Sequence, residues 1–212
     1  MKLIEVKQLE LPGVQVIRFG RFADERGYFS EILRKSDIKK NKELGFLKDV
    51  DFVQFNENFS KAGVLKGLHF QWEPALGKLI RTVSGHMVDI MLDIRKGSPT
   101  EGKIILYDMP FDGSSDYGEW LWLPPGIAHG SFFLEDSTIE YFFSGDYNPE
   151  GEAGISPLSK GIDWALCDKD LKKEFDEFIS KDYLMGNRDK HGLSLQDWSK
   201  DIRSENFIYN VV

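Results

Sequence analysis

The sequence has 212 residues and a formal net charge of −8, with 41% hydrophobic and 13% aromatic residues. This length and composition predict one domain with a substantial core, because sandwiches and barrels of this size often remain undivided. The acidic balance argues against broad binding to nucleic acid or an anionic membrane, since both require a basic field. The N-terminus has no apolar signal core, no run reaches membrane-spanning length and Cys167 is the single cysteine, so we expect a cytoplasmic protein without an internal disulfide.

Short stretches with the character of strands dominate the first three quarters of the chain. In chain order we expect strands at 14–19, 52–59, 64–71, 78–84, 87–94, 103–109, 120–123, 131–134 and 138–144. Such a series without intervening helical periods predicts an all-β sandwich or barrel. Helices are expected only at the edges, at 36–44, at 168–179 and after an N-cap at Ser194. Without a linker or repeat, the chain reads as one unit, 1–212, with a barrel at about 14–164 and a helical extension at 165–212.

The stretch at 87–94 predicts a strand with two different faces. One face is purely apolar and the other alternates acids with methionines, as a cavity lining would: Val88, Ile90, Leu92 and Ile94 against Met87, Asp89, Met91 and Asp93. In the strand at 52–59, Gln54, Asn56 and Asn58 share one face. Solvent exposure explains such polar stripes equally well, so both interpretations stay open.

The histidines are too few and too scattered for a metal-dependent barrel enzyme. There are four of them, at positions 69, 86, 129 and 191. A metal site would be expected to show two His within three residues, a Glu and a distal His, and His69 has no second His beside it. The sequence therefore favours a barrel without a metal.

His69 and Lys78 lie on consecutive predicted strands. A lone histidine in an apolar strand is usually a core residue, and Leu65 and Gln71 share the predicted face of His69. Lysine, however, is almost never buried without a partner or a task, and Asp89 is available to Lys78 as a partner. A Lys–Asp pair can be purely structural. A base and a cation that meet in a cavity also suit removal of a proton next to a carbonyl.

Three other residues are ambiguous when taken singly. Tyr141 follows the pattern of a core aromatic, and Arg26 could simply pair with the acids around it in a turn. Lys66 has the opposite strand parity to His69, so the two side chains point apart unless Gly67 forms a bulge.

Several motifs occur in a fixed order between about residues 14 and 164. They are FADERGYF at 22–29, QFN at 54–56, VLKGLHFQ at 64–71, GKL at 77–79, VDIMLDIRKGSPT at 88–100, WLPPGIAHG at 122–130, Tyr141, Tyr147 and GIDW at 161–164. With these motifs the chain resembles the dTDP-4-dehydrorhamnose 3,5-epimerases, the nucleotide-sugar branch of the cupin superfamily. The resemblance implies a jelly-roll β-barrel with short peripheral helices, mainly C-terminal, and a homodimer with one active site inside each barrel.

The resemblance also implies roles for individual residues. His69 corresponds to the general base, Tyr141 to the general acid, Lys78 to the cation near the sugar C4 oxygen and Asp189 to the aspartate that pairs with the base, with Asp182 as a competing choice. The implied substrate-binding residues are Arg26, Glu31, Gln54, Phe55, Asn56, Lys66, Gln71, Asp89, His129, Tyr147, Glu152 and Arg188. Tyr147 falls on the position that stacks on the nucleobase.

The chain departs from the family pattern in two places. The family usually has Arg where Lys66 stands, and a lysine keeps the charge but loses the bidentate fork, which leaves the nucleotide open. The C-terminal region is also longer than usual, by about a dozen residues before Asp189.

The expected activity is cofactor-independent epimerisation of a dTDP-4-keto-6-deoxyhexose at C3 and C5, in deoxysugar biosynthesis of the rhamnose type. Proton abstraction next to the C4 carbonyl, an enolate stabilised by the cation and reprotonation from the opposite face describe this chemistry. Three alternatives stay open: an epimerase of C3 or C5 only, a GDP- or CDP-linked substrate, and a non-catalytic cupin that binds a sugar nucleotide. The expected partners are the nucleotide sugar and a second copy of the chain, with the segment 3–19 as a candidate for covering a sheet edge across the dimer.

Overall fold

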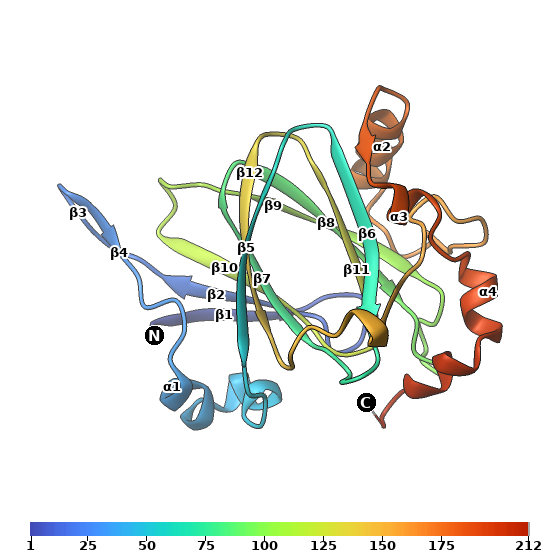
Figure 1. Ribbon diagram of the computed structural model, residues 1–212. Coiled ribbons are helices and arrows are strands. Elements are labelled where there is room, and N and C mark those ends of the chain that lie inside the picture. Colours follow the sequence, from blue (N-terminus) through green and yellow to red (C-terminus); the bar gives the residue numbers. More distant parts are fainter. Residues whose placement is uncertain (212) are drawn as a thin grey trace.

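Two mainly antiparallel sheets face each other in the computed structural model, which describes residues 1–211 (Figure 1). The first sheet has the order β1 (Leu3–Gln8), β2 (Gln15–Gly20), β10 (Tyr117–Leu123), β7 (Lys78–Ser84), β12 (Ser137–Phe143) and β5 (Gln54–Ser60). The second has the order β13 (Glu152–Gly154), β6 (Val64–Gln71), β11 (Ile127–Phe133), β8 (His86–Asp93) and β9 (Ile104–Pro110), and β14 (Leu184–Met185) pairs in parallel with β6. The predicted all-β fold with short peripheral helices is confirmed. No helix within the described residues is long and apolar enough to cross a bilayer.

The alternation along β8 separates two cores. Val88, Ile90 and Leu92 are buried on the outer face of the second sheet, whereas Met87 and Met91 are buried between the sheets. This arrangement confirms the apolar face that the sequence predicts for this strand. Fully burying an apolar side chain of this size contributes about 1.5–3 kcal/mol, so the outer core needs a cover.

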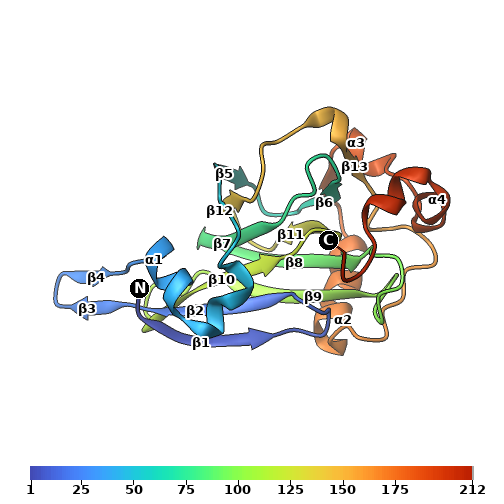
Figure 2. The same cartoon turned by 90° about the horizontal axis from the view of Figure 1, so that it is seen from below.

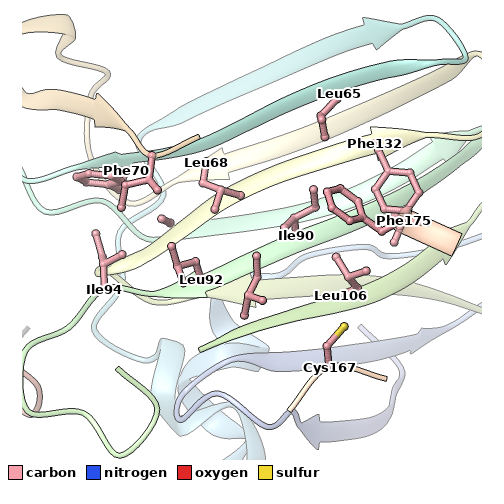
Figure 3. Packing of buried hydrophobic residues seen from close by; sticks show 14 of the residues in the cluster. Leu65, Leu68, Phe70, Ile90, Leu92, Ile94, Leu106, Phe132, Cys167 and Phe175 are labelled. Atoms are coloured by element: carbon pink, nitrogen blue, oxygen red, sulfur yellow. The ribbon is translucent and has the colours of Figure 1, made fainter. Parts of the chain in front are cut away.

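Helix α2 (Lys169–Ile179) provides part of that cover. Asp168 caps it, because its carboxylate accepts hydrogen bonds from two backbone N–H groups of the first turn. Phe175 and Phe178 pack on Phe132 of β11, with ring centroids 5.6 and 4.8 Å apart. Figure 3 shows Phe175 and Phe132 together in this outer core. The helix predicted at 168–179 is confirmed.

The remaining C-terminal elements are α3 (Asn187–Lys190), α4 (Leu195–Lys200) and the 3-10 helix η3 (Ile202–Asn206). Ser194 caps α4 as predicted, since its hydroxyl accepts a hydrogen bond from the backbone N–H of Asp197 at 3.0 Å. Trp198 of α4 is buried against Phe70 of β6, with ring centroids 4.4 Å apart. The extension therefore lies along the outer face of the second sheet (Figures 1 and 2).

The N-terminal region differs from the prediction in two places. The helix predicted at 36–44 is split into α1 (Lys35–Lys40) and the 3-10 helix η1 (Lys42–Leu47). The split lies at Asn41, whose side chain accepts a hydrogen bond from the backbone N–H of Glu43 and caps a new helix. Strand β1 is not among the predicted strands, because at the sheet edge it buries too few side chains to show an alternating pattern.

Two strands begin earlier than predicted. β10 begins at Tyr117, because its first residues pair with β2, and β11 begins at Ile127. The turn before β11 is short, with the backbone N–H of Ile127 donating to the carbonyl of Pro124 at 3.2 Å. His129 therefore lies within a strand of the second sheet rather than in the turn.

A two-stranded arm, β3 (Phe22–Asp24) and β4 (Gly27–Phe29), projects away from the barrel (Figures 1 and 2). All of its residues are exposed, including the aromatic side chains of Phe22, Tyr28 and Phe29. A further short element, the 3-10 helix η2 (Pro149–Gly151), lies directly before β13.

A bulge at Gly67 reorders the faces of β6. Lys66 and His69 are three residues apart, yet they pair with residues of β11 that are only two apart. Lys66 and His69 therefore lie on the same face, which the sequence allows only with such a bulge. Leu65, predicted to share the face of His69, lies instead in the outer core. The bulge is the physical reason, because it reverses the parity of every residue before it.

We expect Gly67→Ala to destabilise the protein strongly. An added Cβ would lie 2.4 Å from the Cα of Gly130 and 2.7 Å from the carbonyl oxygen of His129, and φ at Gly67 is +103°. Both clashing atoms belong to the backbone and cannot rotate away, so urea denaturation should show a loss of about 3 kcal/mol or more.

Gly63→Ala is the matched control for this prediction. Gly63 also has a positive φ, +77°, but no heavy atom lies within 4 Å of the added Cβ. Only the conformational cost of about 1–2 kcal/mol is therefore expected. Equal losses in the two variants would contradict the tight approach of β6 to β11.

Candidate active site

A histidine–aspartate pair connects β6 with α3. Nε2 of His69 lies 2.6 Å from Oδ1 of Asp189, and the other carboxylate oxygen accepts a hydrogen bond from the backbone N–H of Gly67 at 3.3 Å. Burial opposes ionisation of Asp189, but the hydrogen bond and charge of His69, the backbone hydrogen bond from Gly67 and the charge of Arg188 together outweigh it, so the pKa of this carboxyl is lowered. An ionised carboxylate on Nε2 fixes the tautomer of the imidazole, with the proton on Nε2 and the lone pair on Nδ1. Nδ1 of His69 is therefore prepared to accept a proton.

Lys78, at the start of β7, places a buried positive charge beside this pair. Its Nζ donates a hydrogen bond to the carbonyl oxygen of His69 at 3.2 Å, and the residue is 8% exposed. Burial lowers the pKa of Lys78 to about 8, although the charges of Glu152 and Asp89 act in the opposite direction. At neutral pH the group is still an ammonium. Because it is desolvated, it stabilises a nearby negative charge more strongly than it would in water.

His129 and Asp89 form a second pair in the barrel interior. Nε2 of His129 lies 2.9 Å from Oδ2 of Asp89, and both residues are buried. Burial lowers the pKa of His129 and raises the pKa of Asp89. Asp89 is thus held mainly by His129 rather than by Lys78, the partner that the sequence suggested.

Tyr141 faces this second pair from the other sheet. Its ring lies edge-on to His129, with centroids 6.1 Å apart. Burial and the charge of Asp89 both raise the pKa of Tyr141, so its hydroxyl keeps its proton at neutral pH. A proton donor on β12 therefore faces the sheet that carries the base.

Lys66 contributes a further cation on the face of His69. Its Nζ donates hydrogen bonds to Oδ1 of Asn58 and to the hydroxyl of Ser60, each at 2.7 Å. Burial lowers the pKa of Lys66, whereas the charge of Asp189 raises it. Asn58 and Ser60 are not among the site residues predicted from the sequence. Their spacing predicts them, because both continue the alternation of Gln54 and Asn56 along β5.

The segment between β12 and β13 covers the edge of the site. The hydroxyl of Tyr147 donates to Oε2 of Glu152 at 2.9 Å, and Arg188 donates to the same oxygen at 2.7 Å. The backbone N–H of Tyr147 donates to the side-chain oxygen of Gln54 at 2.8 Å, and the next N–H donates to that of Gln71 at 2.8 Å. Tyr147 remains 46% exposed, so an aromatic side chain is presented to solvent beside these groups.

Taken together, these groups offer a base, a cation and a proton donor on facing strands. Among residues 1–211, no group of three or more His, Cys, Asp or Glu side chains is arranged to hold a metal ion. His86, the first residue of β8, pairs with Asp108 at 2.5 Å and makes no hydrogen bond with the groups described above.

Proteins of similar sequence identify the family. The family model described as dTDP-4-dehydrorhamnose 3,5-epimerase matches residues 8–197. The chain belongs to this family. The dTDP-4-dehydrorhamnose 3,5-epimerase of Sinorhizobium fredii is 39% identical over 163 residues, which cover 74% of this chain and 79% of the relative. The one of Shigella flexneri is 38% identical over 191 residues, which cover 86% of this chain and 100% of the relative.

Solved structures agree with this assignment. A dTDP-6-deoxy-D-glucose-3,5-epimerase from Legionella pneumophila, in complex with dTDP-4-keto-L-rhamnose, superposes with a TM-score of 0.76 at 28% identity. The match covers 96% of this chain and 97% of that one. The predicted cupin jelly roll and the predicted enzyme class, an isomerase that epimerises, are thereby confirmed.

Two residues that the epimerase motifs assign to the substrate lie apart from the groups described above. Arg26 is at the tip of the arm, where its side chain is 84% exposed and paired with Asp24 at 2.6 Å. Glu31 follows the arm and accepts a hydrogen bond from the amino group of Met1 at 3.0 Å. The arm carries both away because it leaves the barrel instead of folding back over it (Figure 1).

Two further residues singled out in the sequence make other contacts than those groups. Phe55 points outward from β5 and is 53% exposed, because its neighbours Gln54 and Asn56 take the inner face. Asp93, which the sequence places on the same strand face as Asp89, accepts hydrogen bonds from side chains of the following turn, which are Arg95, Ser98 and Thr100.

The choice between the two candidate aspartates is visible in the geometry. Asp189 lies against His69, whereas Asp182 is exposed in the segment before β14. β14 explains the difference, since it pairs with β6 and brings the following turn of α3 next to the bulge.

Proposed function

We propose that this epimerase inverts C3 and C5 of a dTDP-linked 4-keto-6-deoxyhexose without a cofactor, in deoxysugar biosynthesis of the rhamnose type. The observation that carries the proposal is an oriented base and a protonated acid on facing sheets, with a buried cation beside the base. These groups are His69 on β6, Tyr141 on β12 and Lys78 on β7. Inversion of a carbon requires removal of a proton from one face and delivery to the other, which this placement supports.

Each step uses one of these groups. The C–H bonds at C3 and C5 are acidic because each adjoins the C4 carbonyl, and Nδ1 of His69 takes the proton while Asp189 stabilises the imidazolium. Lys78 donates to the C4 oxygen as it becomes an enolate. Tyr141 then delivers its proton to the same carbon from the opposite face. The imidazolium releases a proton to solvent and the phenolate takes one up, so the reaction is balanced.

The nucleotide end is assigned to the entrance. The exposed ring of Tyr147 offers a face for stacking on the nucleobase. Lys66 offers a positive charge to the diphosphate, without the two parallel donors of an arginine. Because all nucleoside diphosphates share the diphosphate, selectivity for dTDP then depends on contacts with the base, such as stacking on Tyr147.

Solvent deuterium tests the proposed function. The protein is incubated with dTDP-4-keto-6-deoxyglucose in D₂O, and deuterium at C3 and C5 is read by NMR. Label at both carbons together with the inverted product is expected. Label at one carbon would make the protein a single-site epimerase, and no label would leave a non-catalytic binding protein.

We expect the activity to fall on the alkaline side as Lys78 loses its proton. Its pKa of about 8 predicts that kcat/KM decreases with increasing pH above about 8, and that Lys78→Arg, which stays charged, removes this limb. The decrease cannot be attributed to unfolding through this group. Because the folded pKa lies below the ordinary value of 10.5, the deprotonation of Lys78 favours the folded state as the pH rises. A flat profile to pH 9.5 would contradict the role of Lys78.

A homodimer completes this proposal. The arm presents Phe22, Tyr28 and Phe29 to solvent, and the open edge strand β5 presents Phe55 and Phe59. An exposed sheet edge with apolar side chains is a surface that proteins normally cover. We infer that the arm of one protomer adds to β5 of its partner, which would bring Arg26 to the partner's site.

Mixed variants test the exchanged arm. Arg26→Ala and His69→Asn are each expected to be inactive alone, but a heterodimer of the two has one site with both residues intact. Random mixing then restores about one quarter of the wild-type activity. A lack of recovery in subunits shown to exchange, or a monomer by light scattering at micromolar concentration, would contradict the arrangement.

We also propose that the chain is one structural unit located in the cytoplasm. Strands of the barrel and helices of the C-terminal extension build one outer core together. Cys167 is buried and unpaired, which suits a reducing compartment.

A further inference from the structure

Hydrogen bonds on either side of the Arg188–Asp189 peptide bond connect the exposed Tyr147 with His69. Oε2 of Glu152 accepts from Tyr147 at 2.9 Å and from Arg188 at 2.7 Å. Arg188 precedes Asp189 in α3, a helix of four residues, and Asp189 holds His69 at 2.6 Å. An aromatic ring at the surface and the base inside are thus connected through Glu152, Arg188 and the backbone of α3.

Glu152 is the residue of this network that the sheet holds in place. It lies on β13, which pairs with β6 so that Glu152 is opposite Gln71 and Gly154 is opposite His69. Its side chain is 11% exposed, compared with 54% for Arg188. The ion pair raises the pKa of Arg188, so the charge is present at every relevant pH. The two exposed residues, Tyr147 and Arg188, are therefore anchored by a residue that is mostly shielded from solvent.

We propose that Glu152 and Arg188 are positioning residues. Through them, the alignment of Asp189 with His69 depends on whether a nucleobase is stacked on Tyr147. The inference rests on the proposed function, in which the nucleobase stacks on Tyr147. Stacking excludes water from the tyrosine and strengthens its hydrogen bond to Glu152. Glu152 then holds Arg188 more rigidly, and the single turn that carries Asp189 becomes ordered against His69. Binding energy from the nucleotide is in this way used at the reacting carbon.

A purely local role makes a different prediction. If Glu152 and Arg188 only contact the substrate, their loss weakens binding and raises KM with kcat unchanged. If they position the base, their loss lowers kcat while the affinity for the nucleotide is kept.

Glu152→Gln separates the two, because the amide keeps the shape and one acceptor oxygen but removes the charge. We expect kcat to fall about tenfold, with KM and the Kd for dTDP within about threefold of wild type. Asp176→Asn is the matched control, since it removes an exposed ion pair with Lys172 on α2, away from the site. It should change neither constant. A higher KM with unchanged kcat in Glu152→Gln would overturn the inference.

A spectroscopic readout is independent of turnover. The proton between Nε2 of His69 and Asp189 is followed by NMR, with assignment by its loss in His69→Asn, while dTDP alone is added. In the wild type we expect a shift of this proton on saturation, and in Glu152→Gln no shift although dTDP still binds. If Glu152→Gln does not fold, Tyr147→Phe, which keeps the ring and removes the hydroxyl, must show the same loss of response.

The outcomes of the two proposals can be told apart. Saturation of the wild type with dTDP without a shift, or a wild-type shift in Glu152→Gln or Tyr147→Phe, overturns the coupling and leaves the epimerase activity untouched. A shift in the wild type without conversion of the 4-keto sugar keeps the coupling and overturns the proposed reaction.

Discussion

His69→Asn is expected to lose solvent exchange at both C3 and C5 by at least about 10³-fold while the protein stays folded. Asparagine has a similar reach and can still hydrogen-bond to Asp189, but it has no nitrogen that accepts a proton. Both carbons depend on the same base, because His69 is the histidine with Nε2 on an ionised carboxylate and a buried ammonium beside it. The measurement is deuterium incorporation by NMR, with circular dichroism as the check of folding.

His86→Asn is the control for this change. It removes a histidine–aspartate pair of similar geometry, His86 with Asp108 at 2.5 Å, at the first residue of β8. Its exchange rates should match the wild type. Near-normal exchange at either carbon in His69→Asn would instead make His69 a core histidine and refute the proposed mechanism.

Tyr141→Phe is expected to separate exchange from inversion. Without the hydroxyl, the delivery of a proton from the face opposite His69 is lost, so net epimerisation falls by about 10²–10⁴-fold. His69 can still remove a proton and return it to the same face, and exchange with solvent therefore continues. The ring volume is kept, so the free energy of unfolding should change by only about 1 kcal/mol.

Tyr107→Phe is the matched control, because Tyr107 also packs against the inner core and donates a hydrogen bond, to Glu119 at 3.1 Å. It should alter stability slightly and leave both exchange and inversion in place. Full epimerase activity in Tyr141→Phe would move the acid role to Tyr147 or to a water molecule.

The fold was largely predictable from the sequence because strict alternation leaves a readable pattern. β8 shows this best, since Val88 and Ile90 face one core and Met87 and Met91 the other. The pattern is weak where a strand has little to bury, as in β1 and in the arm, and these elements were not predictable as strands.

The site was less predictable because it depends on contacts that are distant in sequence. Nothing near His69 indicates that Asp189, 120 positions later, becomes its partner; only the family motif suggests it. The shared face of Lys66 and His69 depends on one bulge at Gly67, which strand parity alone predicts against. Conversely, the motif places Arg26 at the substrate, although Arg26 is exposed on the arm of β3 and β4, which projects away from the barrel (Figure 1).

Because Asp189 lies late in the sequence, the site is completed after the barrel strands during translation. Every strand of the barrel except the short β14 has been synthesised by residue 154, whereas the carboxylate that prepares His69 arrives only with α3. A ribosome-bound chain can therefore assemble most of the barrel before it holds an oriented base. A product that ends before Asp189 would contain the strands up to residue 154, but it would lack both the oriented base and part of the cover of the outer core.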